Sequence, residues 1–524
     1  MRRLALFLSF SVGFLSLSQE IVWVRVVSFV LGGRPHAFPT VLTAFLIGIA
    51  LGAIAGRRLC EKSAHLVRDA GWVLLAAAAA DLGALYAASA LMGGMAANHS
   101  LVFLVPAIAL TAGLKGVLFP IVHHLGSSQT AGRIGRSVSR VYVGNVLGST
   151  FGPVVTGFIL LDFVSVEAVF ALIGGLTAVL GTVAFASGTQ RPKTGAVLAC
   201  ALLVVGGAYS TFRAPEVVTA IAKGGDPNVQ VRHVIQNRQG IIHVLAEDDV
   251  RKGDITLGGN VYDGRVSVDM TVNSNGLERG YLMAALHPHP RRSLVVGMST
   301  GAWTRAISGF PGMESVDVVE INPGYLHLIQ MYPTVSPLLG DARVKIHIDD
   351  GRRWLRAHPH ERYDLIFQNT TFHYRAYTSL LLSKEYMHEL KRHLNPGGIV
   401  AINTTGSMDV YRTALEVFQF VVWYKNFAYM SDQPLKKRTD AEQVLRQCRV
   451  GEVSAFPDAL FTDDKIGKTL AQDKLGEVHE RIAVADLREP ARVITDLNLI
   501  PEFRHGISPF RVLRPLLPPT PHDD

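Results

Sequence analysis

Glycine and acidic residues follow two short apolar runs in the second half of the chain, in a pattern that could bind a nucleoside. In "VGMSTGAW", Gly297 and Gly301 let the backbone turn sharply and approach a bound group before a helix that we expect to begin at about Ala302. Glu320 ends the next run, in "VVEINPG", 23 residues beyond Gly297. An acid at about that distance can accept hydrogen bonds from both hydroxyls of a ribose.

A third apolar run is followed by "DDGRRWL", which adds groups that could hold a base. Asp349 and Asp350 can accept hydrogen bonds from an exocyclic amine, and Gly351 lets a flat ring lie close. Each residue alone also fits a helix cap or a turn, because Asp and Gly favour both. Three such sites after successive strands favour a nucleoside site, since ligands of open α/β sheets bind at the carboxyl ends of strands. The phosphate-binding pattern GxxxxGK[ST] does not occur in the sequence, which disfavours an ATPase of that class.

A fourth run, "DLIFQNTTFHYRAY" (364–377), ends in amide, hydroxyl, imidazole and phenol groups, and its polar part, 368–377, contains no carboxylate. His373 could act as a base, because an imidazole titrates near neutral pH, and Asn369 is a second candidate catalytic residue. Tyr374, Arg375 and Tyr377 could frame an acceptor with an anionic or aromatic part. The alternative is that His373 and Tyr377 only cap the next helix or pack beneath the loop.

The apolar runs themselves predict the elements that position these residues. Nearly all-apolar strands that alternate with helical stretches indicate a parallel sheet covered on both faces, hence a doubly wound α/β domain over residues 293–430. Short alternating segments punctuated by glycine indicate a small antiparallel sheet over residues 230–292, with its third strand in "GRVSVDMTV" (264–272). We expect a linker at residues 213–229 and a C-terminal extension at residues 431–524.

The first part of the chain has the composition of a helical membrane domain, residues 1–212. Residues 1–212 contain 14 Lys+Arg and 6 Asp+Glu, so the whole formal charge of +8 lies there, and the chain is 48% hydrophobic. A span needs about 20 apolar helical residues to cross roughly 30 Å of hydrocarbon. We expect seven spans, near residues 4–31, 38–56, 71–93, 100–122, 141–161, 163–186 and 195–212.

The distribution of basic residues gives the orientation of these spans. Eleven Lys and Arg residues lie in the N-terminal segment and the loops on the same side, against Arg34 alone in the alternate loops. This excess predicts a cytoplasmic N-terminus. Because the basic residues lie between apolar spans and not along one face of a soluble domain, we expect no binding to nucleic acid. Seven crossings would leave the soluble domain outside, and we leave its side of the membrane open.

Ionisable residues inside the spans call for partners, because charge at mid-membrane is costly. Glu20, Arg25, Asp81 and Lys115 are such residues. An internal ion pair, such as Glu20 or Asp81 with Lys115, is favoured over a transport path. Glycine-rich runs at 48–56 and 144–152 are typical of close helix packing. The three cysteines form no CxxC pair or metal-spaced cluster with histidine, so we expect neither a disulfide framework nor a metal site.

The order of the motifs "SLVVGMSTGAW", "VVEINPG", "RVKIHIDDGRRWL", "YDLIFQNTT" and "LLSKEYMHELKRHLNPGGIVAIN" resembles the spermidine synthase-like family over roughly residues 230–425. That resemblance implies the fold of S-adenosylmethionine-dependent methyltransferases, with S-adenosylmethionine or its decarboxylated form as co-substrate. The membrane half is similar to that of bacterial proteins in which a transporter-like segment is fused to such a domain. By this resemblance Gly297, Ser299 and Gly301 would line the amino-acid end of the co-substrate, Glu320 its ribose, and Asp350 with Gly351 its adenine.

The chain also departs from the pattern of polyamine synthases. The glutamine of their DGxxQ element is Ser267 here, and "NSNGLERGYLM" offers only Glu278 and Tyr281 where they carry acids with a Tyr-His pair. Their fourth strand ends in an acid-containing loop that binds and deprotonates the amine, where this chain has "QNTT" (368–371). An amide cannot accept a proton near pH 7.

Together these features predict a multi-pass transferase of the bacterial inner membrane that alkylates, by aminopropyl transfer, an amine-type small-molecule acceptor. Two alternatives remain. The first is an S-adenosylmethionine-dependent methyltransferase, and the second is a non-catalytic transporter or sensor with a nucleotide-binding regulatory domain. By the family resemblance, the soluble domain could also form a homodimer.

Overall fold

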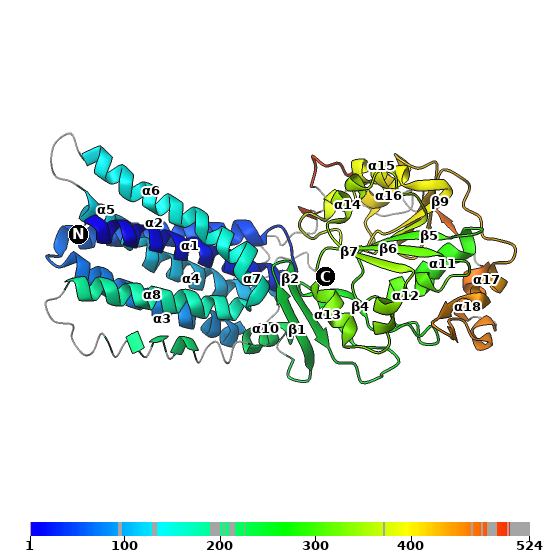
Figure 1. The fold of residues 1–524 in the computed structure, drawn as a ribbon, viewed down its shortest axis with the longest axis horizontal. Helices are drawn as coiled ribbons and strands as arrows, with labels where there is room; N and C mark the ends of the chain where they lie inside the picture. Colours follow the sequence, from blue (N-terminus) through cyan, green and yellow to red (C-terminus); the bar gives the residue numbers. More distant parts are fainter. Residues whose placement is uncertain are drawn as a thin grey trace, which may run out of the picture. The chain divides into compact units, whose positions relative to one another are not determined.

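The computed structural model divides the chain into two units, Met1–Ile241 and Ile242–Gly506. We describe each unit by itself (Figure 1). The residues that the structure describes are 2–92, 97–127, 134–188, 197, 200–201, 203–204, 206–208, 215–224, 226–369, 372–462, 465–472, 475–478, 490–499 and 502–503.

Within these residues, the first unit contains six helical segments long and apolar enough to cross a membrane, which agrees with the expected helical half. The seventh expected span, residues 195–212, lies mostly outside the described residues. The six segments are α1 (Arg2–Val30), α2 (Ala37–Lys62), α3 (Leu66–Met92), α4 with α5 (Ala97–Gly116, Leu118–Gly126), α6 with η1 and α7 (Ile134–Val155, Thr156–Leu160, Leu161–Phe163), and α8 (Val166–Gly188). A short helix, α10 (Pro215–Ala222), and strand β1 (Val231–Asn237) complete the unit.

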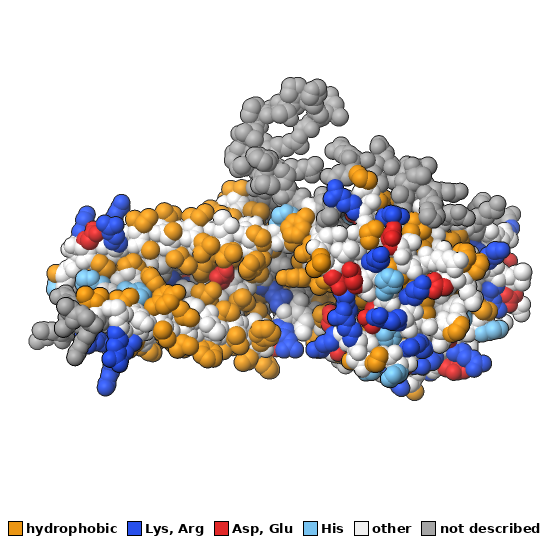
Figure 2. Space-filling model, turned by 90° about the horizontal axis from the view of Figure 1, so that it is seen from above, with side chains coloured by type: hydrophobic (Ala, Val, Ile, Leu, Met, Phe, Trp, Pro, Cys, Tyr) orange, Lys and Arg blue, Asp and Glu red, His pale blue; other side chains and the backbone are white. Residues whose placement is uncertain are grey.

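The surface of this unit carries many exposed large apolar side chains, such as Phe7, Leu51 and Phe158, each at least half exposed. Figure 2 shows apolar side chains along the length of the helices and Lys and Arg side chains near their ends. A lipid-facing surface has this distribution, because hydrocarbon solvates apolar side chains and charged residues stay in the aqueous boundary regions.

Glycines allow the helices of this unit to pack closely, as their runs predict. A Cβ atom on Gly52 of α2 would lie 2.0 Å from the carbonyl oxygen of Gly113 in α4. In the same way, a Cβ atom on Gly148 of α6 would lie 2.0 Å from the carbonyl oxygen of Phe10 in α1. Neither distance leaves room for a side chain, so these helix pairs depend on glycine.

An ion pair lies inside the helical unit, in agreement with the preferred interpretation of its charged residues. The Lys115 Nζ atom lies 2.6 Å from both carboxylate oxygens of Asp81 and 2.7 Å from Oε1 of Gln19. The Thr177 hydroxyl donates to the same carboxylate at 3.2 Å. Both charged side chains are almost completely buried, so the cluster pairs its charges internally and links four helices.

The second unit is built on a mixed sheet of eight strands, counted over the described residues, in the order β14-β10-β11-β9-β8-β5-β6-β7. Neighbours from β9 to β7 pair in parallel, as the apolar runs predict, and β11, β10 and β14 add antiparallel pairs. The strands are β5 (Arg292–Val296), β6 (Ser315–Glu320), β7 (Val344–Ile348), β8 (Tyr363–Gln368), β9 (Leu394–Asn403), β10 (Phe420–Tyr424), β11 (Phe427–Ser431) and β14 (Gly476–Glu477).

Helices alternate with these strands, which confirms the predicted doubly wound α/β domain. Its sheet continues past the expected boundary at residue 430, because β11 ends at Ser431 and β14 lies at Gly476–Glu477. A core of buried side chains from β5, β8, β9, α15 and α16 lies against one face of the sheet. The helices and turns of this unit are α11 (Glu278–Leu286), α12 (Ala302–Ser308), α13 (Gly324–Gln330), η2 (Ser336–Gly340), α14 (Gly351–Ala357), η3 (Thr378–Leu381), α15 (Lys384–Arg392), α16 (Met408–Leu415), α17 (Ala441–Gln447), η4 (Asp458–Phe461) and α18 (Ile466–Gln472). A small hairpin is formed by β12 (Arg449–Val450) and β13 (Val453–Ser454).

The small antiparallel sheet differs from its prediction in its last strand. β2 (Gly240–Leu245) pairs with β3 (Ile255–Gly258), and β3 pairs with β4 (Val261–Arg265), whereas we expected the third strand at residues 264–272. The cause is a two-residue turn at Gly259 and Asn260, which have φ angles of 59° and 64°. Two successive positive φ angles are typical of a tight hairpin turn, so β4 starts directly after it.

Candidate active site

The turn after β5 has a backbone conformation that glycine favours. Gly297, Ser299 and Gly301 have φ angles of 84°, 49° and 78°. A Cβ atom on Gly301 would lie 2.9 Å from Cδ1 of Ile329, so the turn also packs tightly. The Ser299 hydroxyl donates to the main-chain oxygen of Asp263 at 2.7 Å, which ties the turn to β4.

Glu320, at the end of β6, is fixed beside this turn. Its carboxylate accepts the backbone N–H groups of Met298 at 2.8 Å, Ser299 at 3.3 Å and Asn322 at 2.8 Å. Burial raises the pKa of Glu320 to about 7; the three hydrogen bonds oppose the shift, and the neighbouring Asp263 adds to it. A buried carboxylate that titrates near neutrality is typical of functional sites.

The residues after β7 begin α14. The Asp350 carboxylate accepts the backbone N–H of Arg353 at 2.8 Å and therefore caps the helix, which was one of its two sequence interpretations. A Cβ atom on Gly351 would lie 2.7 Å from Cγ1 of Val296, at the end of β5. Because β5, β6 and β7 are neighbours in the sheet and run parallel, the predicted nucleoside-binding residues lie along one edge.

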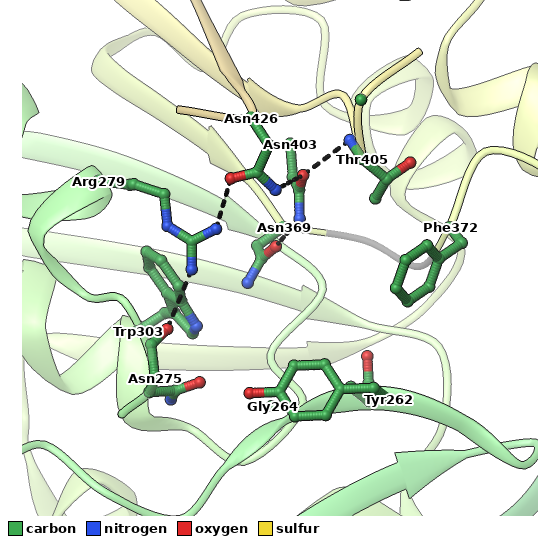
Figure 3. Close-up of a pocket in the computed structure, with 12 residues that line it drawn as sticks. Tyr262, Gly264, Asn275, Arg279, Trp303, Asn369, Phe372, Asn403, Thr405 and Asn426 are labelled. Atoms are coloured by element: carbon green, nitrogen blue, oxygen red, sulfur yellow. Dashed lines mark hydrogen bonds between the residues drawn. The ribbon is translucent and has the colours of Figure 1, made fainter. Parts of the chain in front are cut away.

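Asn369, after β8, belongs to a chain of amide groups at the other side of this edge (Figure 3). Its Oδ1 atom accepts the Asn403 amide N–H at 2.8 Å, and Oδ1 of Asn403 accepts that of Asn426 at 2.7 Å. Arg279 of α11 then donates from Nη1 to Oδ1 of Asn426 at 2.6 Å. Three strand ends and one helix thus contribute one network. Residues 370 and 371 of the same loop lie outside the described residues.

The other two candidates from this loop have different surroundings. His373 is 6% exposed, and its Nδ1 atom lies 2.6 Å from the Thr405 hydroxyl, which also accepts the backbone N–H of His373. Tyr377 is 75% exposed, and its backbone N–H donates to the buried Glu502 carboxylate at 3.0 Å. Tyr377 precedes η3, where the same carboxylate accepts the N–H of Ser379.

A cavity of about 290 Å³ lies between the small sheet and the ends of β8, β9 and β11. Asn369 and Thr405 line this cavity, and the Thr405 hydroxyl contacts the ring of His373. Tyr377 is not among the lining residues. Its lining consists mainly of amide, aromatic and hydroxyl groups: Tyr262, Asp263, Gly264, Asn275, Arg279, Trp303, Asn369, Phe372, Asn403, Thr405, Gly406 and Asn426.

Several of these lining residues were missed by the sequence interpretation. Of "NSNGLERGYLM", Asn275 and Arg279 reach the cavity, whereas Glu278 pairs with Lys425 and Tyr281 is buried against Phe456. Asn403 could have been found, since it is the last residue of β9 and Asn369 directly follows β8. Asn426 lies in the β10–β11 hairpin, where no local sequence pattern marks a ligand-binding residue.

The small sheet contributes a carboxyl group that the β8 loop lacks. Asp263 of β4 lines the cavity, and its carboxylate accepts a hydrogen bond from the Tyr325 hydroxyl. Burial raises the pKa of Asp263, and the nearby Arg375 guanidinium opposes that shift. Ser267, four residues along, instead donates to the main-chain oxygen of Arg251 at 2.7 Å.

Comparison with known proteins finds a match that includes part of this site. Residues 281–421 match the spermine/spermidine synthase domain. The polyamine aminopropyltransferase 2 of Streptomyces coelicolor is 28% identical over 413 residues, which are 74% of this chain and 71% of that protein. Because 74% of the chain is longer than its second unit, that match extends into the helical half.

Two further matches concern the second unit. The polyamine aminopropyltransferase of Agathobacter rectalis is 32% identical over 117 residues, 22% of this chain and 40% of that protein. A solved spermidine synthase from Thermotoga maritima is 17% identical, covers 44% of this chain and 86% of its own, and has a TM-score of 0.34. The chain is therefore similar to the spermine/spermidine synthase domain over residues 281–421, and its first unit contains six long apolar helical segments among the described residues.

Proposed function

We propose that the second unit transfers an alkyl group from S-adenosylmethionine or its decarboxylated form to an amine-type acceptor, and that aminopropyl transfer is its main reaction. The observation that carries this proposal is the Glu320 carboxylate, buried at a strand end and joined to the Gly297–Gly301 turn by two backbone hydrogen bonds. A carboxylate at this place is suited to the two hydroxyls of a ribose. The match to the spermine/spermidine synthase domain supports the same reaction class.

The reaction has a simple balance of bonds. The nitrogen lone pair of the acceptor forms a bond to a carbon attached to the sulfonium sulfur, and the carbon–sulfur bond breaks. The electron pair of that bond neutralises the sulfur, which leaves as a thioether, and the nitrogen releases one proton. Such a transfer depends mainly on holding the two reactants in line, so positioning groups contribute more than covalent chemistry.

We assign positioning of the acceptor to Asn369, because its amide lines the cavity at the end of β8. His373 would take the released proton through the Thr405 hydroxyl, which lies between its ring and the cavity. Tyr377 would act through its backbone, since Glu502 fixes its N–H while its side chain points to solvent. On the nucleoside side, Gly297, Ser299 and Gly301 would hold the amino-acid end, and Asp350 and Gly351 the adenine.

The test is turnover by the full-length protein purified in detergent. We expect product from at least one of the two sulfonium nucleotides when primary amines are supplied, measured by mass spectrometry of the alkylated acceptor. The Glu320→Gln variant should lose this activity, while Glu416→Gln, which alters an exposed pair with Arg412, should keep it. If the protein binds a nucleotide but forms no product with any acceptor, the proposed transferase function is contradicted. The alternative of a non-catalytic transporter or sensor with a nucleotide-binding regulatory domain would then be favoured.

Methyl transfer is the second candidate function. Arg279 favours it, because a guanidinium in the cavity can hold the carboxylate that S-adenosylmethionine has and its decarboxylated form lacks. A transporter function has less support, since the Asp81 and Lys115 charges pair with each other inside the helical unit.

We further propose that the protein spans the inner membrane of a bacterium with its N-terminus in the cytoplasm. The six long apolar helices and the excess of basic residues on one side support this topology. The test is to place a cysteine-containing tag at each terminus of the protein and to measure, in intact cells, whether a cysteine-reactive label added outside reaches it. Labelling of the N-terminal tag from outside would contradict it.

A further inference from the structure

Arg279 gives the cavity a fixed positive charge. Its Nε atom donates to the main-chain oxygen of Gly276 at 2.9 Å, its Nη2 atom to that of Asn275 at 3.1 Å, and its Nη1 atom to Asn426 at 2.6 Å. A guanidinium has five N–H donors. Two therefore have no acceptor among the described residues, and Figure 3 shows the group facing the cavity beside Asn369.

Aromatic rings hold this guanidinium in place. Its Cζ atom lies 5.1 Å from the centroid of a Trp303 ring and 5.3 Å from that of Phe427. Both rings are buried and belong to the stack of Trp303, Phe367 and Phe427. The guanidinium is thus fixed before any ligand arrives, so a ligand that pairs with it loses little additional conformational freedom.

The acidic groups around the cavity already have partners. Asp263 accepts the Tyr325 hydroxyl and lies near Arg375, and Glu278, next to Arg279 in the sequence, pairs with Lys425. The remaining polar lining consists of amides and hydroxyls, which carry no net charge. A cationic diamine would meet Arg279 without a carboxylate dedicated to it, whereas an anion would be matched.

We propose that this cavity binds a carboxylate group of the reactants through Arg279, so that the enzyme prefers a carboxylate-bearing ligand to its decarboxylated or cationic counterpart. This inference rests on the proposed function and names the specificity of the same site. Arg is suited to the task because its planar fork can form two parallel hydrogen bonds to one carboxylate. The second N–H groups of Nη1 and Nη2 are the donors.

Two reactants could supply the carboxylate. One is S-adenosylmethionine, whose methionyl part would extend from the Gly297–Gly301 turn. That turn lies beside the wall of the cavity, since a Cβ atom on Gly264, a lining residue, would lie 3.9 Å from the Ser299 hydroxyl. The other is the acceptor, if it is an amino acid. The shared chemistry is the carboxylate, and the experiment separates the two sources.

The experiment uses the full-length protein in detergent and two pairs of probes that differ in one carboxylate. The first pair is S-adenosylmethionine and its decarboxylated form, and the second is 5-aminovalerate and 1,4-diaminobutane, measured with the nucleotide bound. Isothermal titration gives the ratio of dissociation constants in each pair. We expect the wild type to favour the carboxylate member of at least one pair, and Arg279→Gln to reduce that preference about tenfold or more, because a charge-assisted pair is lost.

The pair that responds identifies the source of the carboxylate. A response of the nucleotide pair would favour methyl transfer over aminopropyl transfer, whereas a response of the acceptor pair alone would keep aminopropyl transfer as the main reaction. Arg279→Lys retains the charge without the fork and should fall between the wild type and Arg279→Gln. Arg412→Gln, on the surface of α16, is the matched control and should leave both ratios unchanged. A thermal melt of each variant separates loss of binding from loss of fold.

The wild type alone can overturn the inference, even if an Arg279 variant does not fold. Preference for the decarboxylated nucleotide together with preference for 1,4-diaminobutane would contradict it, and so would ratios that Arg279→Gln leaves unchanged. The proposed function would survive either result, because both require nucleotide binding. If neither nucleotide binds, the proposed function itself fails.

Discussion

The two sides of the strand-end edge in the second unit are built from different chemistry. After β5, β6 and β7, glycines with positive φ and the buried Glu320 carboxylate offer acceptors and close backbone approach. After β8, β9 and β10, three asparagines and Arg279 offer amides and one fixed cation. The first side therefore suits a ligand with hydroxyl donors, and the second a neutral or anionic group.

This difference teaches which part of a shared fold determines the substrate. The nucleoside side follows the pattern that the family resemblance implies, including an acid at the end of β6. The other side has no acid in residues 368–377 and carries Arg279 from the helix that precedes β5. If the proposed function holds, a change of acceptor would involve only the side after β8, and the side after β5 to β7 would keep its nucleotide.

The largest effect should come from Glu320→Gln on the nucleoside side. Charge-assisted hydrogen bonds contribute about 1.5–3 kcal/mol each, so losing two to a ribose should weaken nucleotide binding by more than about 100-fold. Isothermal titration of the full-length protein measures it, with Glu416→Gln as the exposed control. A change of less than about threefold in nucleotide affinity would show that Glu320 does not bind the ribose, and the contrast between the two sides would then no longer hold.

Asn369→Asp should move the second side toward a polyamine-type acceptor. The new carboxylate can still accept the Asn403 amide N–H and adds a negative charge for a cationic amine. We expect the KM for 1,4-diaminobutane to fall about tenfold, by the usual strength of one charge-assisted bond, while nucleotide affinity stays the same. Equal KM values in wild type and variant would show that position 369 does not contact the acceptor.

Nucleotide affinity should rise several-fold between pH 6 and pH 8, because Glu320 titrates with a pKa of about 7 and its ionised form accepts the ribose hydroxyls. The same shift has an opposite effect on stability. Since the pKa is raised from 4.5 on folding, this residue's contribution to the free energy of unfolding falls as the pH rises from about 4.5 to about 7. Titrations across this range should show the rise in affinity, and Glu320→Gln should flatten it.

The smallest effect should come from Tyr377→Phe. The Tyr377 side chain is 75% exposed. The hydrogen bond to Glu502 is made by its backbone N–H, which the substitution keeps. We expect transfer rates within about twofold of the wild type, by the usual tolerance of exposed positions. His373→Gln is the buried comparison in the same loop, and a larger loss with Tyr377→Phe than with His373→Gln would reverse our assignment of roles.

The sequence predicted the α/β fold, because the fold depends on local patterns, and the nucleoside side stays a prediction that rests on the same patterns. Apolar runs gave the strands β5 to β9, and the strand-end rule directed attention to Gly297, Glu320 and Asp350. The small sheet was less well predicted, since the Gly259–Asn260 turn shifts β4 toward the N-terminus by several residues.

The acceptor side depends on contacts between residues that are distant in the sequence. Arg279 meets Asn426 across 147 residues, and Asn369 meets Asn403 across 34. No local pattern marks a partner at such a separation. The same holds for Asp263, whose role as a cavity residue follows from the packing of β4 against the Gly297–Gly301 turn.

The Glu502 carboxylate, which accepts the N–H groups of Tyr377 and Ser379, has a consequence for the order in which the protein matures. The two partners are separated by up to 125 residues. A ribosome adding about 5–20 residues per second takes roughly 6–25 s to cover that distance. During that time the loop after β8 exists without its support, while the strands before it can already pair. The segment proposed to receive the acceptor therefore reaches its final conformation late in synthesis, after the nucleoside side has been made.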